Sequence, residues 1–84
     1  MKNVTVYTTD SCSLCLSAKA LLERRGIHYA EINLARDADG RAKLQQVTGM
    51  VSFPQILIGE EVVGGFSELL TADREGRLTG LLAA

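Results

Sequence analysis

Residues 4–26 read VTVYTTDSCSLCLSAKALLERRG, and the spacing of the apolar side chains changes within this stretch. Residues 3–8 alternate polar and apolar side chains, which predicts a strand. From residue 13 the apolar positions follow a helical period, and Gly26 after two arginines is a typical helix end. Alternation resumes at residues 27–34, so we predict two parallel strands joined by a right-handed helical crossover.

The second half of the chain predicts a hairpin between helices. Asp37 can cap a helix that runs to about Val47, and Thr48-Gly49 would end it. Gly59-Glu60 separates two short apolar runs, which favours an antiparallel hairpin. Residues 66–82 then predict one or two short closing helices. This order predicts a single α/β domain over residues 1–84, with helices covering one central mixed sheet.

Composition and charge exclude several classes of protein. The 84 residues carry nine Lys and Arg against ten Asp and Glu, a formal net charge of −1. A nucleic-acid partner would require a basic face, so we expect none. No apolar run exceeds five residues, so we expect no membrane partner, and the N-terminal residues lack the apolar segment of a signal peptide. These features predict a cytoplasmic protein.

Cys12 and Cys15 are the only cysteines and require a chemical role. In a reducing compartment a structural disulfide is rare, and a bridge closing so short a loop stabilises little. Cys12 lies where the first strand meets the first helix, and the free amide groups of a helix start favour a thiolate. A thiolate is the nucleophile of disulfide exchange. We therefore predict that Cys12 attacks and that Cys15, one turn further, resolves the mixed disulfide.

A metal site and a pair of inert thiols are weaker interpretations of the two cysteines. A zinc site needs about four ligands, and His28 is the one remaining soft donor in the chain. Two inert buried thiols are also possible, although a C-x-x-C pair at a strand-to-helix junction favours redox chemistry.

Pro54 is the only proline and precedes the apolar run of residues 55–58. It can simply stop the preceding helix. Alternatively, a cis Phe53–Pro54 bond would turn the backbone of Phe53 outward, where an extended peptide could pair with it. The sequence leaves both interpretations open.

Four segments together resemble one known family. Residues 7–22 are similar to the active-site strand and helix of the glutaredoxins, and three later segments resemble that family's other motifs in the right order, namely LQQVTG at 44–49, SFPQI at 52–56 and GGFSE at 64–68. The resemblance covers essentially the whole chain. It implies a thioredoxin-like fold with a four-stranded sheet of order 2-1-3-4, three to four helices and a cis proline.

The resemblance also implies the reaction and the site. The expected enzyme is a monomer that reduces protein disulfides or glutathione mixed disulfides, with glutathione as electron donor and no tightly bound cofactor. Cys12 would be the nucleophile and Cys15 the resolving thiol. The implied glutathione-binding residues are Ser13, Leu14, Arg41, Ser52, Phe53, Pro54, Gly65, Phe66, Ser67 and Glu68. Among these, Phe53 would pair its backbone with the ligand, whereas Ser67 and Glu68 would either meet its γ-glutamyl end or cap a helix.

Departures from the family pattern leave alternatives open. Ser13 and Leu14 stand where the family often has Pro-Tyr, and Thr9 stands where many members have a lysine for the glycyl carboxylate. Arg41 can replace that lysine as a bidentate donor or can be a solvated helix residue. A thioredoxin reductase would be the alternative electron source if glutathione binds poorly.

A cluster-binding dimer is a further alternative. Some glutaredoxins with a small residue at the position of Ser13 hold a [2Fe–2S] cluster between two subunits. In that arrangement Cys12 would be the only metal ligand from each chain, and bound glutathione would supply the others.

Overall fold

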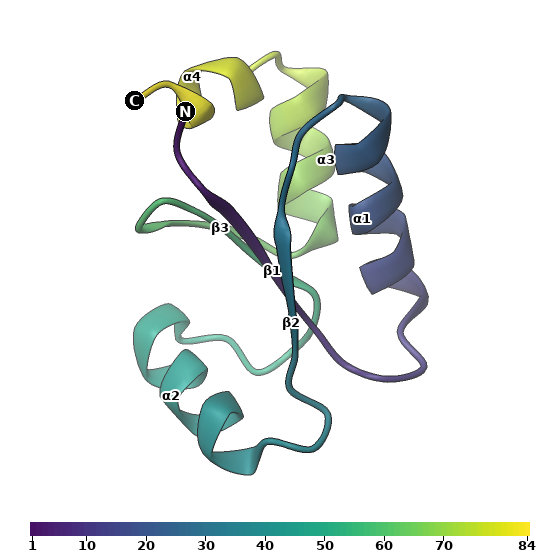
Figure 1. Cartoon of the computed structure of the whole chain (residues 1–84), viewed down its shortest axis with the longest axis vertical. Helices are drawn as coiled ribbons and strands as arrows, with labels where there is room; N and C mark the ends of the chain where they lie inside the picture. Colours follow the sequence, from purple (N-terminus) through teal and green to yellow (C-terminus); the bar gives the residue numbers. More distant parts are fainter.

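Strands and helices alternate along the first part of the chain, and a two-stranded hairpin followed by two helices completes it. The computed structural model describes residues 1–84 (Figure 1). The elements are β1 (Val4–Thr8), α1 (Ser13–Arg24), β2 (Ala30–Asn33), α2 (Ala38–Thr48), β3 (Gln55–Ile58), β4 (Glu61–Gly64), α3 (Phe66–Arg74) and α4 (Leu78–Leu82). None of these helices has the length and apolar character that crossing a membrane requires.

The four strands form one mixed sheet in the order β2-β1-β3-β4. β1 runs parallel to β2 and antiparallel to β3, and β3 is antiparallel to β4. Thr5 lies opposite both Ala30 on β2 and Leu57 on β3. The predicted sheet order is therefore confirmed, and β1 lies at the centre with its C-terminal end leading into the cysteine loop.

The core lies between one face of the sheet and the pair α1 and α3, which Figure 1 shows side by side. Val6 and Ile56 are fully buried partners on adjacent strands, and Leu22 of α1 packs onto the same cluster. Burying each such aliphatic side chain contributes about 1.5–3 kcal/mol. This packing anchors α1, whose first turn carries the cysteines.

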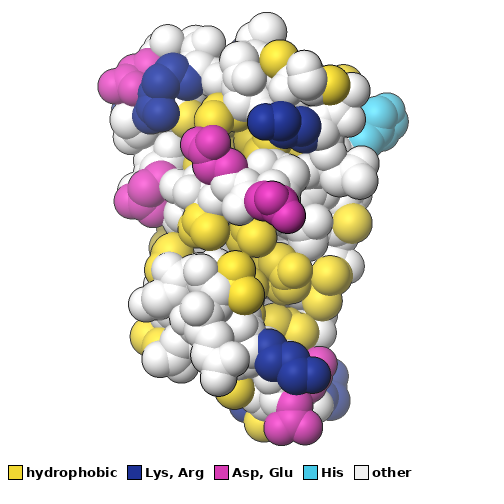
Figure 2. Space-filling view, turned by 90° about the vertical axis from the view of Figure 1, so that its left-hand side faces the viewer, with side chains coloured by type: hydrophobic (Ala, Val, Ile, Leu, Met, Phe, Trp, Pro, Cys, Tyr) yellow, Lys and Arg dark blue, Asp and Glu magenta, His cyan; other side chains and the backbone are white.

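The other face of the sheet is less completely covered. α2 lies at one end of the molecule rather than across the sheet (Figure 1). Figure 2 shows hydrophobic side chains across the middle of one side, between α2 at the bottom and charged side chains above. Ile32, Val47 and Val51 are exposed.

Both long helices have the ends that the sequence predicts. Asp37 caps α2 by accepting a hydrogen bond from the Gly40 amide at 2.8 Å, and Gly49 ends the helix with a φ of 74°. Positive φ favours glycine because it has no Cβ. Gly26 likewise follows α1 with a φ of 68°.

The second strand is shorter than predicted. The expected strand spans residues 27–34, whereas β2 begins at Ala30. The Ile27 amide donates to the carbonyl of Leu22 at 2.9 Å, and Gly26 donates to Glu23 at 3.1 Å. These two bonds form a Schellman motif, so Ile27 belongs to the helix end rather than to the strand.

Candidate active site

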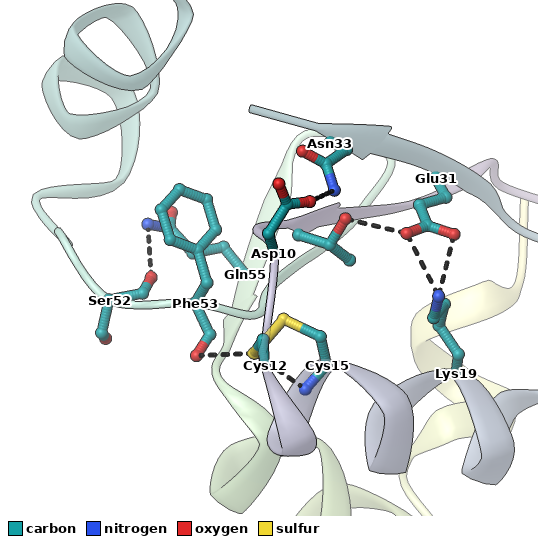
Figure 3. Close-up of a disulfide and its surroundings, with 10 residues drawn as sticks. Asp10, Cys12, Cys15, Lys19, Glu31, Asn33, Ser52, Phe53 and Gln55 are labelled. Atoms are coloured by element: carbon teal, nitrogen blue, oxygen red, sulfur yellow. Dashed lines mark hydrogen bonds and ion pairs between the residues drawn. A yellow bond between two sulfur atoms is a disulfide. The ribbon is translucent and has the colours of Figure 1, made fainter. Parts of the chain in front are cut away.

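Cys12 and Cys15 form a disulfide at the start of α1 (Figure 3). Cys12 is the N-cap residue and is partly exposed, whereas Cys15 is only 2% exposed. The Cys15 amide donates to Sγ of Cys12 at 3.1 Å. The helix start therefore places a hydrogen-bond donor on the accessible sulfur and shields the second one.

A cis peptide bond joins Phe53 to Pro54 beside this disulfide. The Phe53 carbonyl oxygen lies 3.9 Å from Sγ of Cys12, and Figure 3 shows the carbonyl directed at that sulfur. Pro54 is buried and Phe53 is half-buried. The loop thus brings the backbone of Phe53 next to the partly exposed sulfur of Cys12, forty-one positions away in the sequence.

The charged side chains near the site are paired. The carboxylate of Asp10 accepts a hydrogen bond of 3.2 Å from the side-chain amide of Asn33, toward which it is turned in Figure 3. It also lies 3.6 Å from the guanidinium of Arg36. Lys19 of α1 forms an ion pair of 3.1 Å with Glu31. Neither Asp10 nor Lys19 makes a hydrogen bond with the disulfide.

Glu31 also accepts a hydrogen bond of 2.8 Å from the hydroxyl of Thr8, the last residue of β1. This bond and the contact with Lys19 lower the pKa of Glu31 below its ordinary value. The three side chains connect β1, β2 and α1 immediately behind the cysteine loop. Sequence reasoning missed this network, because no local pattern signals three residues on different elements.

Arg41 and Phe53 line one groove of about 280 Å³ between α2 and the loop before Pro54, together with Gln45, Met50 and Val51. Arg41 donates through Nη1 to the carbonyls of Leu34 and Ala35, at 2.6 and 2.9 Å. Its other guanidinium nitrogens make no hydrogen bond within the protein. Arg41 is thus held on the groove wall with donors available.

The predicted residues on α3 lie at the start of that helix. Gly65 is the N-cap, and its amide donates to Oε1 of Glu68 at 2.7 Å, so Glu68 caps the helix. Ser67 is exposed in the first turn and does not cap. A Cβ on Gly65 would lie 3.6 Å from the carbonyl oxygen of Pro54, which places the start of α3 against the cis-proline loop.

The remaining predicted residues flank these groups. Ser13 and Leu14 are exposed in the first turn of α1, with Leu14 51% exposed, and Ser52 is exposed just before Phe53. Phe66 opens α3 and is half-buried. No group of three or more His, Cys, Asp or Glu side chains could hold a metal ion. A cluster would therefore need ligands from outside this chain.

A larger groove of about 380 Å³ lies at the opposite end of the sheet. It is lined by the N-terminal residues, residues 27–30 and Leu82, and it contains no cysteine. The smaller groove contains no cysteine either, but it includes Phe53, whose carbonyl oxygen lies 3.9 Å from Sγ of Cys12.

Comparison with known proteins agrees with this geometry. The glutaredoxin family matches residues 4–63. A glutaredoxin of Neisseria meningitidis is 45% identical over 83 residues, covering 98% of both chains. A glutaredoxin of Pseudomonas aeruginosa is 42% identical over 84 residues and covers 100% of both.

Solved structures give the same result. A crystal structure of a buckwheat glutaredoxin–glutathione complex superposes with a TM-score of 0.87 and 30% identity, over 96% of this chain and 76% of that chain. The solution structure of a Brucella melitensis glutaredoxin has a TM-score of 0.86 and 41% identity, over 98% of this chain and 89% of that one.

Proposed function

Because this chain belongs to the glutaredoxin family of thiol–disulfide oxidoreductases, we propose that it reduces protein disulfides and glutathione mixed disulfides with glutathione as electron donor. One observation carries the proposal. A partly exposed sulfur at a helix start receives an amide hydrogen bond and lies beside the backbone of Phe53. The buckwheat relative, whose fold is closely similar, was crystallised with glutathione, which supports the choice of donor.

The catalytic cycle uses both cysteines. In the reduced protein, the Cys12 thiolate attacks one sulfur of a substrate disulfide and releases the other as a thiolate, which takes up a proton. The Cys15 thiol then loses its proton and attacks Cys12, releasing the second substrate thiol. The product is the Cys12–Cys15 disulfide seen in the structure.

Two glutathione molecules restore the dithiol. The thiolate of the first attacks Cys12, forms a mixed disulfide with it and frees Cys15. The second attacks the sulfur of the bound glutathione, which gives glutathione disulfide and the Cys12 thiolate. One substrate disulfide is thus reduced to two thiols while two glutathiones are oxidised. The Cys15 amide stabilises Cys12 whenever it is the leaving thiolate.

Glutathione would lie across the groove beside the disulfide. Its cysteine pairs with the backbone of Phe53, and its γ-glutamyl end meets the start of α3 at Ser67 and Glu68, where amide groups suit a carboxylate. Its glycyl carboxylate meets Arg41, which compensates for the uncharged Thr9. The groove shared by Arg41 and Phe53 supports this orientation.

The protein would act as a monomer in the cytoplasm. The cycle requires a reducing pool that returns the disulfide to the dithiol, and such a pool is characteristic of the cytosol.

The test is turnover of a glutathione mixed disulfide by wild type, Cys12→Ser and Cys15→Ser. We expect Cys12→Ser to lose activity entirely. Cys15→Ser should keep deglutathionylation and lose reduction of protein disulfides, because that reaction needs the resolving thiol. Full activity in Cys12→Ser would refute the mechanism.

A second assay tests the electron donor. Oxidised protein is mixed with glutathione or with thioredoxin reductase and NADPH, and the rate of disulfide reduction is compared. Glutathione should be the faster reductant, and a faster reaction with the reductase would reassign the electron source.

A further inference from the structure

Gln55 begins β3 directly after the cis proline, and its side chain is only 1% exposed. Its Nε2 donates to the carbonyl of Ser52 at 2.9 Å and to that of Met50 at 3.2 Å. Its Oε1 lies 2.8 Å from the hydroxyl of Thr48, which donates to it. Figure 3 shows the carboxamide reaching back to Ser52 along the loop that carries Phe53.

The orientation of this amide follows from its partners. Both acceptors of Nε2 are backbone carbonyls, which cannot donate, so the NH₂ group must face them. The NH₂ group of the carboxamide therefore donates to the loop, and its oxygen accepts from Thr48 at the end of α2. A buried amide is unfavourable unless it is bonded in this way, and an apolar side chain would fill a strand position at less cost.

These bonds hold the loop from both sides. Met50 and Ser52 flank Val51, and Ser52 immediately precedes Phe53. The Thr48 hydroxyl also accepts from the Met50 amide at 3.0 Å, so the same network links the loop to α2. The Phe53 carbonyl, at the end of this fixed segment, lies 3.9 Å from Sγ of Cys12.

We propose that Gln55 is a positioning residue for substrate binding, because its carboxamide holds the loop of residues 50–53 in the conformation that presents the Phe53 backbone to glutathione bound at Cys12. This inference rests on the proposed function. Gln55 acts through the loop and does not touch the reacting sulfurs. Its loss therefore weakens binding of the glutathione moiety and leaves the activation of Cys12 by α1 intact.

The experiment compares Gln55→Met, which keeps length and removes every hydrogen bond, with Thr48→Val, which removes only the hydroxyl. The control is Ile58→Val, a core truncation in the same strand and away from the loop. Three quantities are measured on each variant, namely KM and kcat with a glutathione mixed disulfide, the rate of Cys12 alkylation in the reduced protein, and the urea midpoint.

We expect KM to rise ~10-fold in Gln55→Met and ~3-fold in Thr48→Val, with kcat and the alkylation rate within about twofold of wild type. Ile58→Val should lower the urea midpoint and leave KM unchanged. A KM within twofold of wild type in folded Gln55→Met overturns the inference, as does an equal rise in Ile58→Val. If Gln55→Met does not fold, an unchanged KM in Thr48→Val overturns it instead. Wild-type protein that fails to turn over the substrate overturns the proposed function itself.

Discussion

At the scale of single residues, the accessible sulfur could be identified from the sequence and its supporting side chains could not. The position of Cys12 at a helix start could be predicted, because the spacing of the apolar residues changes there from a strand period to a helix period. Gln55 and Glu31 form hydrogen bonds with residues on other elements. Glu31 bonds to Thr8 and Lys19, which are distant from it in the sequence. A strand pattern shows which side chains face inward, but it does not show which polar group will find a buried partner.

The ion pair of Glu31 predicts a pH dependence of stability. The pKa of Glu31 is lowered chiefly by the Thr8 hydroxyl and then by Lys19. Since the folded-state pKa lies below the unfolded one, Glu31 stabilises the protein above the unfolded value, and this contribution is lost as the pH falls through the folded value. We expect Glu31→Gln to lower the free energy of unfolding by under about 1 kcal/mol at pH 7. Urea titrations of both proteins should show this difference shrinking toward pH 3.

Glu31→Gln keeps the shape and an acceptor for Thr8, so it isolates the charge. A difference between the two proteins that stays constant from pH 7 to pH 3 would contradict the role of the ionised carboxylate.

At the scale of elements, the ends of α1 and α2 and the limits of β1 and β3 could be predicted from the sequence, whereas the start of β2 could not. Asp37 and Gly49 mark the ends of α2 in the sequence, and both have the expected conformations. The start of β2 depends on where the hydrogen bonds that end α1 stop. The backbone amides of Gly26 and Ile27 make these bonds, and the side-chain pattern does not show them. The isomer of Pro54 was also open, because the sequence allowed two conformations and tertiary packing selects one.

Two glycine substitutions compare a helix end with a helix interior. Gly49→Ala places a Cβ at a φ of 74°, where nothing lies within 4 Å, so its effect is purely conformational. It should destabilise the protein by about 1–2 kcal/mol. Gly80→Ala in α4 also meets nothing within 4 Å but has an ordinary φ, and it should stabilise by up to about 1 kcal/mol. Thermal unfolding of both variants measures the contrast, and shifts of the same sign would contradict it.

At the scale of the whole molecule, the connections predicted a parallel strand pair and a hairpin in one mixed sheet, and both are present. The order 2-1-3-4 followed from the family resemblance rather than from the connections, and the structure confirms it. The less complete cover on one face could not be predicted, since the position of α2 depends on tertiary contacts. The chain ends also meet, because the Lys2 amide donates to the carbonyl of Leu82 at 2.9 Å.

Removal of α4 should therefore weaken the whole fold. Deleting residues 78–84 removes Leu78 and Leu82, which are 6% and 8% exposed and belong to the core. We expect a loss of about 3–6 kcal/mol of unfolding free energy, a large part of a typical total. Urea denaturation followed by circular dichroism measures it. Deleting only Ala83 and Ala84, which are exposed, is the control, and equal losses in the two truncations would contradict the role of the leucines.

The short β2 strand has a consequence for self-association. β2 is an edge strand of the sheet, and it forms this open border with only four residues. All four are exposed, and Glu31 is one of the two central ones. A neighbouring chain that tried to extend the sheet there would find few free backbone groups and would have to accommodate a carboxylate already held by Lys19. This border is thus a poor template for fibril growth, even though apolar side chains remain exposed nearby.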